Sequence, residues 1–279
     1  MTPTWPSTAA GTEPATADRA RAANSALICG WLRRSRHEPA AQAWVLRGSI
    51  VIAAQCAGAR VPGDVDYLLE GGATRFDAAA IERAVRSLCA RSDEHDGDAT
   101  SLRVECCEVI WGETASPGLR VSLSGDVGAV RDHRLQVDLA VGDPMCVPPR
   151  RLAISGVGDV LACALETLFG WKLHGLAEFG RGKWRAKDLY DLDVLWREAH
   201  LDRPATRAAV ELAFSSRALP LSALHDFRMR PTWGQSLGGN RKWRALRKAH
   251  PQITDDQSAT RDRVRAALDE LLGPPLSPG

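Results

Sequence analysis

The chain has 279 residues, of which 44% are hydrophobic, so it can fill the core of one large domain or of two modest ones. Its formal net charge is only +2, but residues 1–149 carry 15 basic and 19 acidic groups, whereas residues 150–279 carry 21 and 15. The acidic half suits metal binding, and the basic half suits a polyanion.

The same composition argues against several classes of protein. No apolar run approaches the length of a transmembrane helix, so we expect no membrane partner. The seven cysteines include no C-x-x-C pair and no Cys/His ligand spacing. This pattern argues against zinc and indicates free thiols in a reducing, cytoplasmic compartment. Residues 1–18 are rich in Thr, Pro and Ala and lack the regions of a signal peptide, so we expect a flexible tail.

Residues 19–149 are predicted to form an α/β domain, a mixed sheet with packed helices. Helices are expected over residues 18–37, 50–57 and 76–91, strands over residues 44–47, 65–69, 101–111, 119–124 and 134–141, and an acidic loop over residues 92–98. An apolar stripe that includes Trp31 lies opposite arginines in the first helix. Alternating helices and strands, followed by consecutive strands, are typical of such a sheet.

Two aspartates, Asp64 and Asp66, follow Ser49 by 15 and 17 positions. Residues i and i+2 of a strand point to the same face, so the two carboxylates would converge where divalent cations are held. The Gly48-Ser49 pair, at a predicted strand-to-helix turn, leaves backbone N–H groups free to face a triphosphate. Together these features suit nucleotidyl or phosphoryl transfer, although a D-x-D alone is more often a solvated turn.

Asp138 is a third candidate carboxylate. It lies in a predicted strand whose apolar positions alternate with polar ones over residues 135–141. A carboxylate inside such a strand is costly unless it is paired or bound to a metal.

Residues 150–279 are predicted to form an all-α domain, with helices over residues 157–178, 187–200, 204–217 and 261–272. Lys172 lies within an apolar helical stretch, which indicates either contact with a nucleotide phosphate or a side chain that extends to water. Asp188 lies where it could cap the next helix, and Asp191 follows three residues later. The Gly156-Val-Gly158 stretch is too short for a dinucleotide-binding motif.

Residues 228–250 form a basic segment with seven cations and no acid. Trp233 and Trp243 interleave these cations, and such a mixture suits nucleic acid through phosphate contacts and base stacking. The candidate contacts are Arg241, Lys242, Arg244 and Arg247. The other interpretation is a solvated basic helix whose tryptophans pack into the core.

These motifs resemble those of the AbiEii-type nucleotidyltransferase toxins, which include the mycobacterial MenT proteins. The residues Leu46-Arg-Gly-Ser49, Arg60 and Asp64-Val-Asp66 are similar to the first motif of that family. The order Lys172-Leu-His174 and then Lys187-Asp-Leu-Tyr-Asp191 resembles its downstream lysine and K-D-x-x-D motifs.

The resemblance spans about residues 44–195 of the sequence. Arg47 stands where many relatives have lysine, and Val61-Pro-Gly replaces a more polar approach to the first aspartate. Neither departure removes a carboxylate, but both leave the nucleotide preference open.

The resemblance implies a nucleotidyltransferase-like domain with a helical C-terminal domain. It also implies Mg²⁺-dependent transfer of NMP from NTP to an acceptor, often tRNA in MenT relatives, by a toxin that a neighbouring antitoxin restrains. In this interpretation Asp64 and Asp66 hold Mg²⁺, and Asp138 assists as ligand or base. The triphosphate would be bound by Gly48, Ser49, Arg60 and Lys172. Asp188 would face the catalytic cleft.

Two other functions fit the sequence. A small-molecule nucleotidyltransferase that modifies an antibiotic would need an acidic acceptor pocket, and the basic segment over residues 228–250 argues against one. A non-catalytic module that binds nucleic acid or a protein partner would keep the fold without the chemistry. The presence of all three carboxylates argues against that loss.

Overall fold

The structure is a computed structural model that describes residues 16–70, 76–91, 100–114 and 116–274. The chain divides into two compact units. Unit 1 comprises Met1–Ala54, Val61–Asp143 and Pro149–Ala162, and unit 2 comprises Gln55–Arg60, Pro144–Pro148 and Cys163–Gly279. Most of the predicted tail over residues 1–18, and the predicted acidic loop over residues 92–98, lie outside the described residues.

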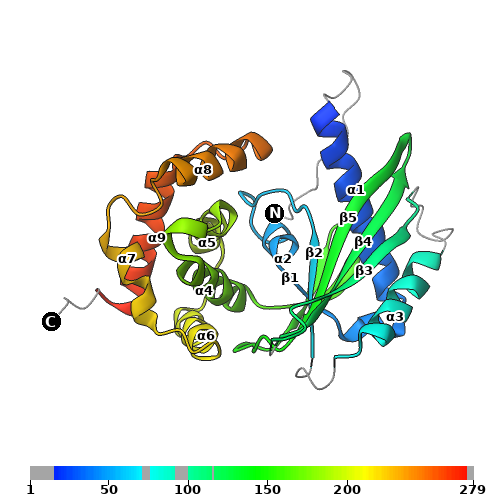
Figure 1. The fold of residues 1–279 in the computed structure, drawn as a ribbon, viewed down its shortest axis with the longest axis horizontal. Helices are drawn as coiled ribbons and strands as arrows, with labels where there is room; N and C mark the ends of the chain where they lie inside the picture. The colour runs from blue at the N-terminus through cyan, green and yellow to red at the C-terminus, as the bar shows by residue number, and fades with distance from the viewer. Residues whose placement is uncertain (1–15, 71–75, 92–99, 115, 275–279) are drawn as a thin grey trace. The chain divides into compact units, whose positions relative to one another are not determined.

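The described part of unit 1 forms a seven-stranded sheet in the order β3-β4-β5-β2-β1-β7-β6 (Figure 1). Its strands are β1 (Val45–Arg47), β2 (Val65–Leu69), β3 (Arg103–Ile110), β4 (Gly118–Val127), β5 (Val130–Val141), β6 (Arg150–Ile154) and β7 (Gly158–Ala162). The β2–β5 and β1–β7 pairs are parallel and the other pairs are antiparallel, so the predicted mixed sheet is confirmed.

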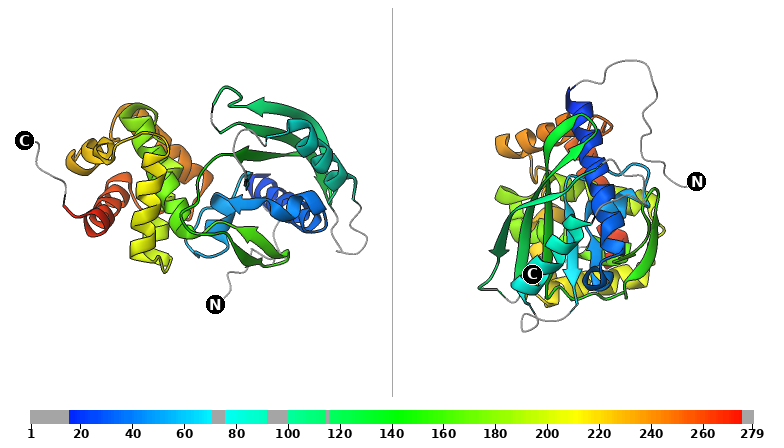
Figure 2. Two further views of the ribbon diagram at one scale, coloured as in Figure 1. Left: turned by 90° about the horizontal axis from the view of Figure 1, so that it is seen from below. Right: turned by 90° about the vertical axis from the view of Figure 1, so that its right-hand side faces the viewer.

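Two helices, α1 (Thr16–Arg36) and α3 (Ala78–Ala90), cover one face of this sheet (Figures 1 and 2). The predicted apolar stripe of α1 is fully buried, including Leu27 and Trp31. Each such side chain contributes roughly 1.5–3 kcal/mol when it leaves water. Between β1 and β2 lies the short helix α2 (Ser49–Ala53), and η1 (Pro39–Ala43) precedes β1.

Residues 150–162 correct the predicted domain boundary. The helical domain was expected to begin at residue 150, with a helix from residue 157, but β6 and β7 form a hairpin there. Gly156 and Gly158 both have positive φ, of 73° and 97°, which lets the chain turn. The apolar residues after this turn suit a strand or a buried helix equally well, and pairing with β1 selects the strand.

In unit 2 the described residues after Cys163 form helices. These are α4 (Leu165–Lys183), α5 (Ala186–Glu198), α6 (Arg203–Ser215), η3 (Leu221–Leu224), α7 (His225–Met229), α8 (Leu237–Ala249) and α9 (Gln257–Leu272). Helix α4 packs against α6 at Gly170, where an added Cβ would lie 2.6 Å from the Ala209 carbonyl oxygen. Phe169, Trp184 and Phe214 are fully buried in this unit. Within the described residues, no helix has the length and apolar content needed to span a membrane.

Candidate functional site

The Gly48-Ser49 turn lies directly against the D-x-D motif. Arg47, the last residue of β1, is the antiparallel partner of Asp66 in β2. Gly48 follows with φ of 80°, and a Cβ added to it would lie 2.6 Å from Asp66 Oδ2. Only glycine allows both this backbone conformation and this close approach. The structure therefore brings together the turn and the carboxylate that the sequence spacing paired.

A row of four charged residues crosses the sheet beside this turn. Strand register aligns Arg120 of β4 with Asp138 of β5, Asp138 with Asp66 of β2, and Asp66 with Arg47 of β1. Residues in direct register point to the same face, and neighbouring strands lie about 4.8 Å apart. The row therefore has two adjacent carboxylates at its centre and one arginine at each end.

Each arginine of this row makes an ion pair. Arg120 donates to Asp138 through Nε at 2.9 Å and through Nη2 at 2.8 Å, and Gln136 donates to the same carboxylate. Arg47 pairs instead with Asp143, at 2.7 Å. These contacts explain how the sheet tolerates the buried Asp138, and they give Arg47 a structural partner.

The structure favours Asp64 and Asp66 over Asp138 as ligands for Mg²⁺. Within the described ranges, no three His, Cys, Asp or Glu side chains are grouped closely enough to hold a metal ion. Asp64 lies just before β2, is half-buried, and makes no hydrogen bond or ion pair with any described residue. Mg²⁺ commonly binds one or two carboxylates together with substrate phosphates. Asp64 and Asp66 fit that donor set, whereas Asp138 is engaged by Arg120.

Ser49 is a buried polar residue at the turn. Its side chain is 3% exposed, and its hydroxyl forms no hydrogen bond with the described part of the chain. An unpaired buried hydroxyl costs about 1–3 kcal/mol. A ligand oxygen that accepted this hydrogen bond would recover part of that cost.

Unit 2 contains a buried charge network around Lys172. The Lys172 ammonium lies 2.7 Å from Asp191 and 3.3 Å from Asp188, and its side chain is only 11% exposed. Burial alone would lower the pKa of Lys172, but the charges of Asp191 and Asp188 outweigh it and raise that pKa. The ammonium therefore lies in the charge network and does not extend to bulk water. The alternative interpretation, a lysine side chain that extends to water, is wrong.

Asp191 joins Arg60 to the same network. Arg60 donates to the Asp191 carboxylate through Nε at 3.0 Å and through Nη2 at 3.2 Å. Burial alone would raise the pKa of Asp191, but Lys172 and Arg60 outweigh it and lower that pKa. Arg60 itself is 7% exposed, so its predicted contact with nucleotide would have to be made from within this network.

Asp188 does not cap α5. Arg185 occupies the N-cap position, and Asp188 lies three residues further along the chain. Its side chain is 2% exposed and accepts hydrogen bonds from Lys172 and Arg185. The capping alternative is therefore wrong, because the carboxylate is used by two cations instead of by backbone N–H groups.

Two further contacts tie the Gln55–Arg60 segment to α5. Tyr190 donates to the Gly58 carbonyl oxygen at 2.6 Å. The Gly58 N–H donates to Glu198 at 2.7 Å. With the Arg60–Asp191 pair, they fix the segment that joins the end of α2 to the residues before the D-x-D motif.

The basic segment over residues 228–250 divides into buried tryptophans and exposed cations. Trp233 and Trp243 are 3% and 4% exposed, and Trp243 donates to the Asp255 carbonyl oxygen. The predicted stacking of Trp243 on an RNA base is therefore wrong, because its ring is in the core. Among the predicted RNA contacts, Lys242 donates to the Trp184 carbonyl oxygen and Arg247 to that of Ile253.

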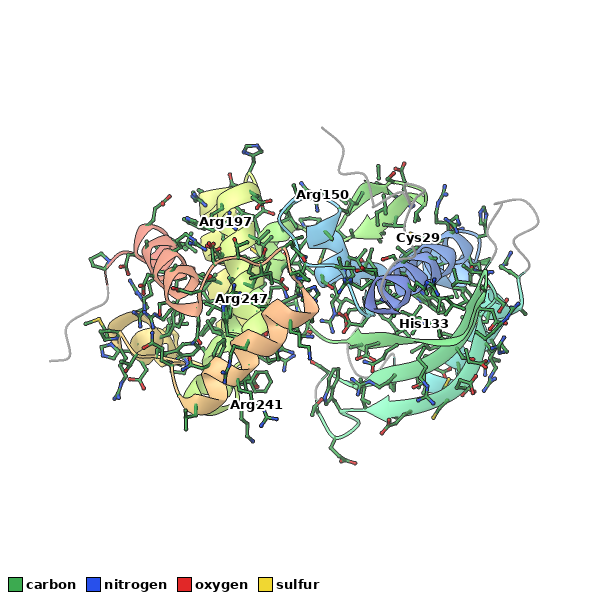
Figure 3. The ribbon with its side chains drawn as sticks, turned by 90° about the horizontal axis from the view of Figure 1, so that it is seen from above. Cys29, His133, Arg150, Arg197, Arg241 and Arg247 are labelled. Atoms are coloured by element: carbon green, nitrogen blue, oxygen red, sulfur yellow. The ribbon has the colours of Figure 1, made fainter. Side chains whose placement is uncertain are left out.

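The outer face of α8 carries a different set of cations. Leu237, Arg241, Arg244 and Lys248 recur at helical spacing and are all exposed, Leu237 at 91%. Arg241, Arg244 and Lys248 make no ion pair or hydrogen bond with any described residue. Arg241 and Arg247 both project from this helix (Figure 3). Arg241, Arg244 and Lys248 are called the α8 cation stripe below.

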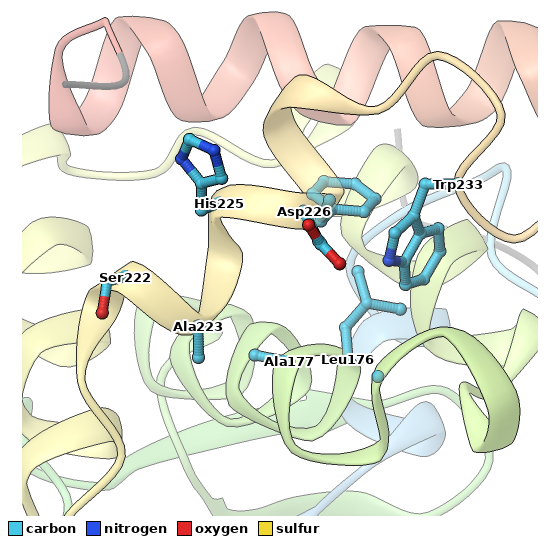
Figure 4. Close-up of a pocket in the computed structure, with 9 residues that line it drawn as sticks. Leu176, Ala177, Ser222, Ala223, His225, Asp226 and Trp233 are labelled. Carbon is cyan, nitrogen blue, oxygen red and sulfur yellow. The ribbon is translucent and has the colours of Figure 1, made fainter. Parts of the chain in front are cut away.

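A cavity of about 290 Å³ lies elsewhere in unit 2. Leu176, Phe227 and Trp233 line it, and the Asp226 carboxylate lies beside them (Figure 4). Asp226 is already paired with Arg230. None of the lining residues is a candidate site residue, so this cavity has no part in the proposed chemistry.

Arg120, Asp143 and Asp191 are the main residues of these clusters that sequence reasoning did not assign. The sequence contains a signal for Asp191, since it lies three residues after Asp188 on the same side of a helix. Nothing local marks Arg120 or Asp143, because their partners lie on other strands.

A glycine turn against a carboxylate on a mixed sheet suits nucleotidyl transfer, and comparisons with known proteins identify the family. The family described as "Nucleotidyl transferase AbiEii toxin, Type IV TA system" matches residues 31–272. The chain belongs to this family. Membership implies an NTP substrate and an antitoxin partner.

The structural comparisons give similar folds. The crystal structure of JHP933 from Helicobacter pylori has a TM-score of 0.53 and 14% identity, over 91% of this chain and 92% of that chain. A candidate nucleotidyltransferase from H. pylori has a TM-score of 0.46 and 14% identity, over 88% and 97%. At this identity the first likeness shows a shared fold. No curated protein matches the chain.

Proposed function

We propose that the protein is a Mg²⁺-dependent toxin that transfers NMP from an NTP to an RNA acceptor, with tRNA as the acceptor class and pyrophosphate as the leaving group. The observation that carries this proposal is the Gly48 turn seated against the Asp66 carboxylate. That contact sets backbone N–H groups suited to phosphate oxygens beside a carboxylate suited to a hard cation.

In the proposed reaction, Asp64 and Asp66 would hold Mg²⁺. When bound, the ion would orient the α-phosphate and neutralise the charge that develops on it. Gly48 and Ser49 bind the triphosphate through the turn backbone and the Ser49 hydroxyl. Asp138 acts as a further ligand or as the base, and it does so only when Arg120 releases its carboxylate.

Lys172 supplies positive charge for the triphosphate. The raised pKa of its ammonium keeps the side chain charged at neutral pH. Its two carboxylate partners hold it in one place. A preorganised cation loses little entropy when a phosphate arrives, and it is worth more in a buried setting than in water. Asp188 helps to hold Lys172 in this role.

The α8 cation stripe is the proposed contact for the RNA backbone. Its three cations are exposed and are not used by any described residue. Each phosphate that they neutralise would release counterions. Lys242 and Arg247 donate hydrogen bonds to backbone carbonyl oxygens. We therefore expect them to add positive charge to this face without extending toward the RNA as far as the stripe does.

Incubation of the protein with each labelled NTP, Mg²⁺ and total tRNA tests the proposal. We expect one NTP to label RNA in a metal-dependent manner, and Asp66→Asn to abolish the labelling. Asp159→Asn is a matched control, because Asp159 is an exposed carboxylate on β7 of the same sheet. Loss of labelling in both variants, or in neither, would contradict the assignment of Asp66. Transfer to other acceptors but never to RNA would remove RNA from the proposal.

A further inference from the structure

Asp191 has no role in the reaction as proposed above, yet it holds two of the cations assigned to the triphosphate. Its side chain is 1% exposed. The carboxylate accepts three hydrogen bonds from the Arg60 guanidinium, and Oδ2 lies 2.7 Å from the Lys172 ammonium. Asp191 thus contacts both of these cations.

Electrostatics makes this arrangement depend on Asp191. Lys172 and Arg60 are like charges, and each lowers the stability of the other's charged form where they meet. Asp191 offsets both. Without it, Asp188 remains for Lys172, at the longer distance of 3.3 Å, and Arg60 loses its pair with Asp191. Removing one partner of a buried ion pair leaves an uncompensated charge, which the structure relieves by moving that charge.

We propose that Asp191 is a positioning residue that sets the place of the Lys172 ammonium and ties the Gln55–Arg60 segment to α5. The inference rests on the proposed function for the link between Lys172 and the triphosphate. In this proposal, the Arg60 guanidinium pairs with Asp191 and thereby holds the Gln55–Arg60 segment against α5. The segment that Arg60 ends lies in the sequence between the Gly48-Ser49 turn and Asp64.

The same helix provides a matched control. Asp193 is also 1% exposed and also holds two arginines, Arg263 at 2.7 Å and Arg197 at 3.1 Å. Arg263 belongs to α9, and Arg197 lies on α5 itself. Asp191→Asn and Asp193→Asn therefore remove the same charge from the same helix at the same burial. They differ in which cations lose a partner, and the cations paired with Asp191 are the more deeply buried.

The kinetic test compares these variants with Asp191→Glu, which keeps the charge. We expect Asp191→Asn to raise the KM for the NTP roughly tenfold, because Lys172 loses the shorter of its two charge-assisted contacts. The KM for RNA should not change. Asp191→Glu should recover much of the loss, and Asp193→Asn should leave NTP kinetics per folded molecule unchanged. Equal effects of Asp191→Asn and Asp193→Asn on the KM for the NTP would overturn the proposal.

Two structural measurements do not depend on the reaction. Hydrogen exchange should become faster over residues 55–60 in Asp191→Asn and not in Asp193→Asn. Acylation of each lysine, followed by mass spectrometry, should label Lys172 faster in Asp191→Asn alone. If the wild type transfers no nucleotide, the proposed function fails, but these two measurements still decide whether Asp191 holds the segment and the lysine. Unchanged exchange and unchanged labelling would reject the inference.

Discussion

Gly48 and Asp66 approach each other so closely across the β1–β2 pair that a methyl group on Gly48 would lie 2.6 Å from a carboxylate oxygen. The turn that begins α2 and the D-x-D motif are therefore one structural element. A substitution at either residue therefore alters the surroundings of the other directly.

Gly48→Ala should impair transfer more than it impairs folding. The backbone strain at φ of 80° and the contact with Asp66 together should cost roughly 1–3 kcal/mol of unfolding free energy. Because Asp66 must move to relieve the contact, NMP transfer should fall further than this cost explains. Urea unfolding and transfer assays measure the two effects. Gly128→Ala is the control, since Gly128 has φ of 56° but open space around it. Normal transfer by Gly48→Ala would contradict this prediction.

Arg120→Gln should destabilise unit 1 by about 1–3 kcal/mol, because it takes a bidentate partner from the buried Asp138 carboxylate. Arg103→Gln provides the comparison. Arg103 on β3 also pairs with two aspartates, but solvent screens these pairs, so their loss should cost less than the loss of the Arg120 pair. Chemical denaturation of the two variants measures the difference. Equal losses would mean that Asp138 does not depend on Arg120.

Lys172→Met should change the dependence of stability on pH. The pKa of Asp191 is lowered in the folded state, so its contribution is present above the ordinary value of about 4 and is lost as pH falls. The pKa of Lys172 is raised, so its contribution is present below about 10 and is lost as pH rises further. The stability difference between wild type and variant should therefore be greatest between these limits. Urea unfolding over a pH series tests this. A difference that stays constant from pH 3 to pH 11 would contradict the ion pair's role.

Replacing the α8 cation stripe with glutamine should weaken RNA binding and reduce its salt dependence. Each neutralised phosphate contributes about 0.9 to the slope of log affinity against log salt on duplex nucleic acid. Three lost contacts should therefore lower the slope by roughly 2–3. Arg203→Gln with Arg207→Gln is the control, because both arginines lie on α6 and already pair with glutamates. An unchanged slope in the stripe variant would make this face a solvated helix surface.

Local sequence patterns predicted the elements whose buried residues recur at the spacing of a helix or of a strand. The stripe around Trp31 predicted α1, and the alternation around Asp138 predicted β5. The β6–β7 hairpin was missed, because the choice of strand over helix at residues 158–162 is made by pairing with β1, more than 100 residues earlier in the chain.

The candidate site divides in the same way. The spacing of Gly48 and Asp66 was enough to predict that they meet, because one hairpin-like pair of strands joins them. The ion pairs of Asp138 and Asp191 were not predictable, since their arginines come from another strand and from a distant segment. Tryptophan in a basic segment fits stacking or burial equally well, and only the packing around Trp243 decided for burial.

The Arg60–Asp191 pair also limits when part of the helical unit can form during translation. The two residues are 131 positions apart, so at about 5–20 residues per second Asp191 leaves the ribosome roughly 7–26 s after Arg60. Strands β2 to β7 are made within that interval, because β2 begins at Val65 and β7 ends at Ala162. The buried charge network of Arg60, Lys172 and Asp191 can therefore form only after the strands have been made. It includes an arginine that is synthesised long before the helices that enclose it.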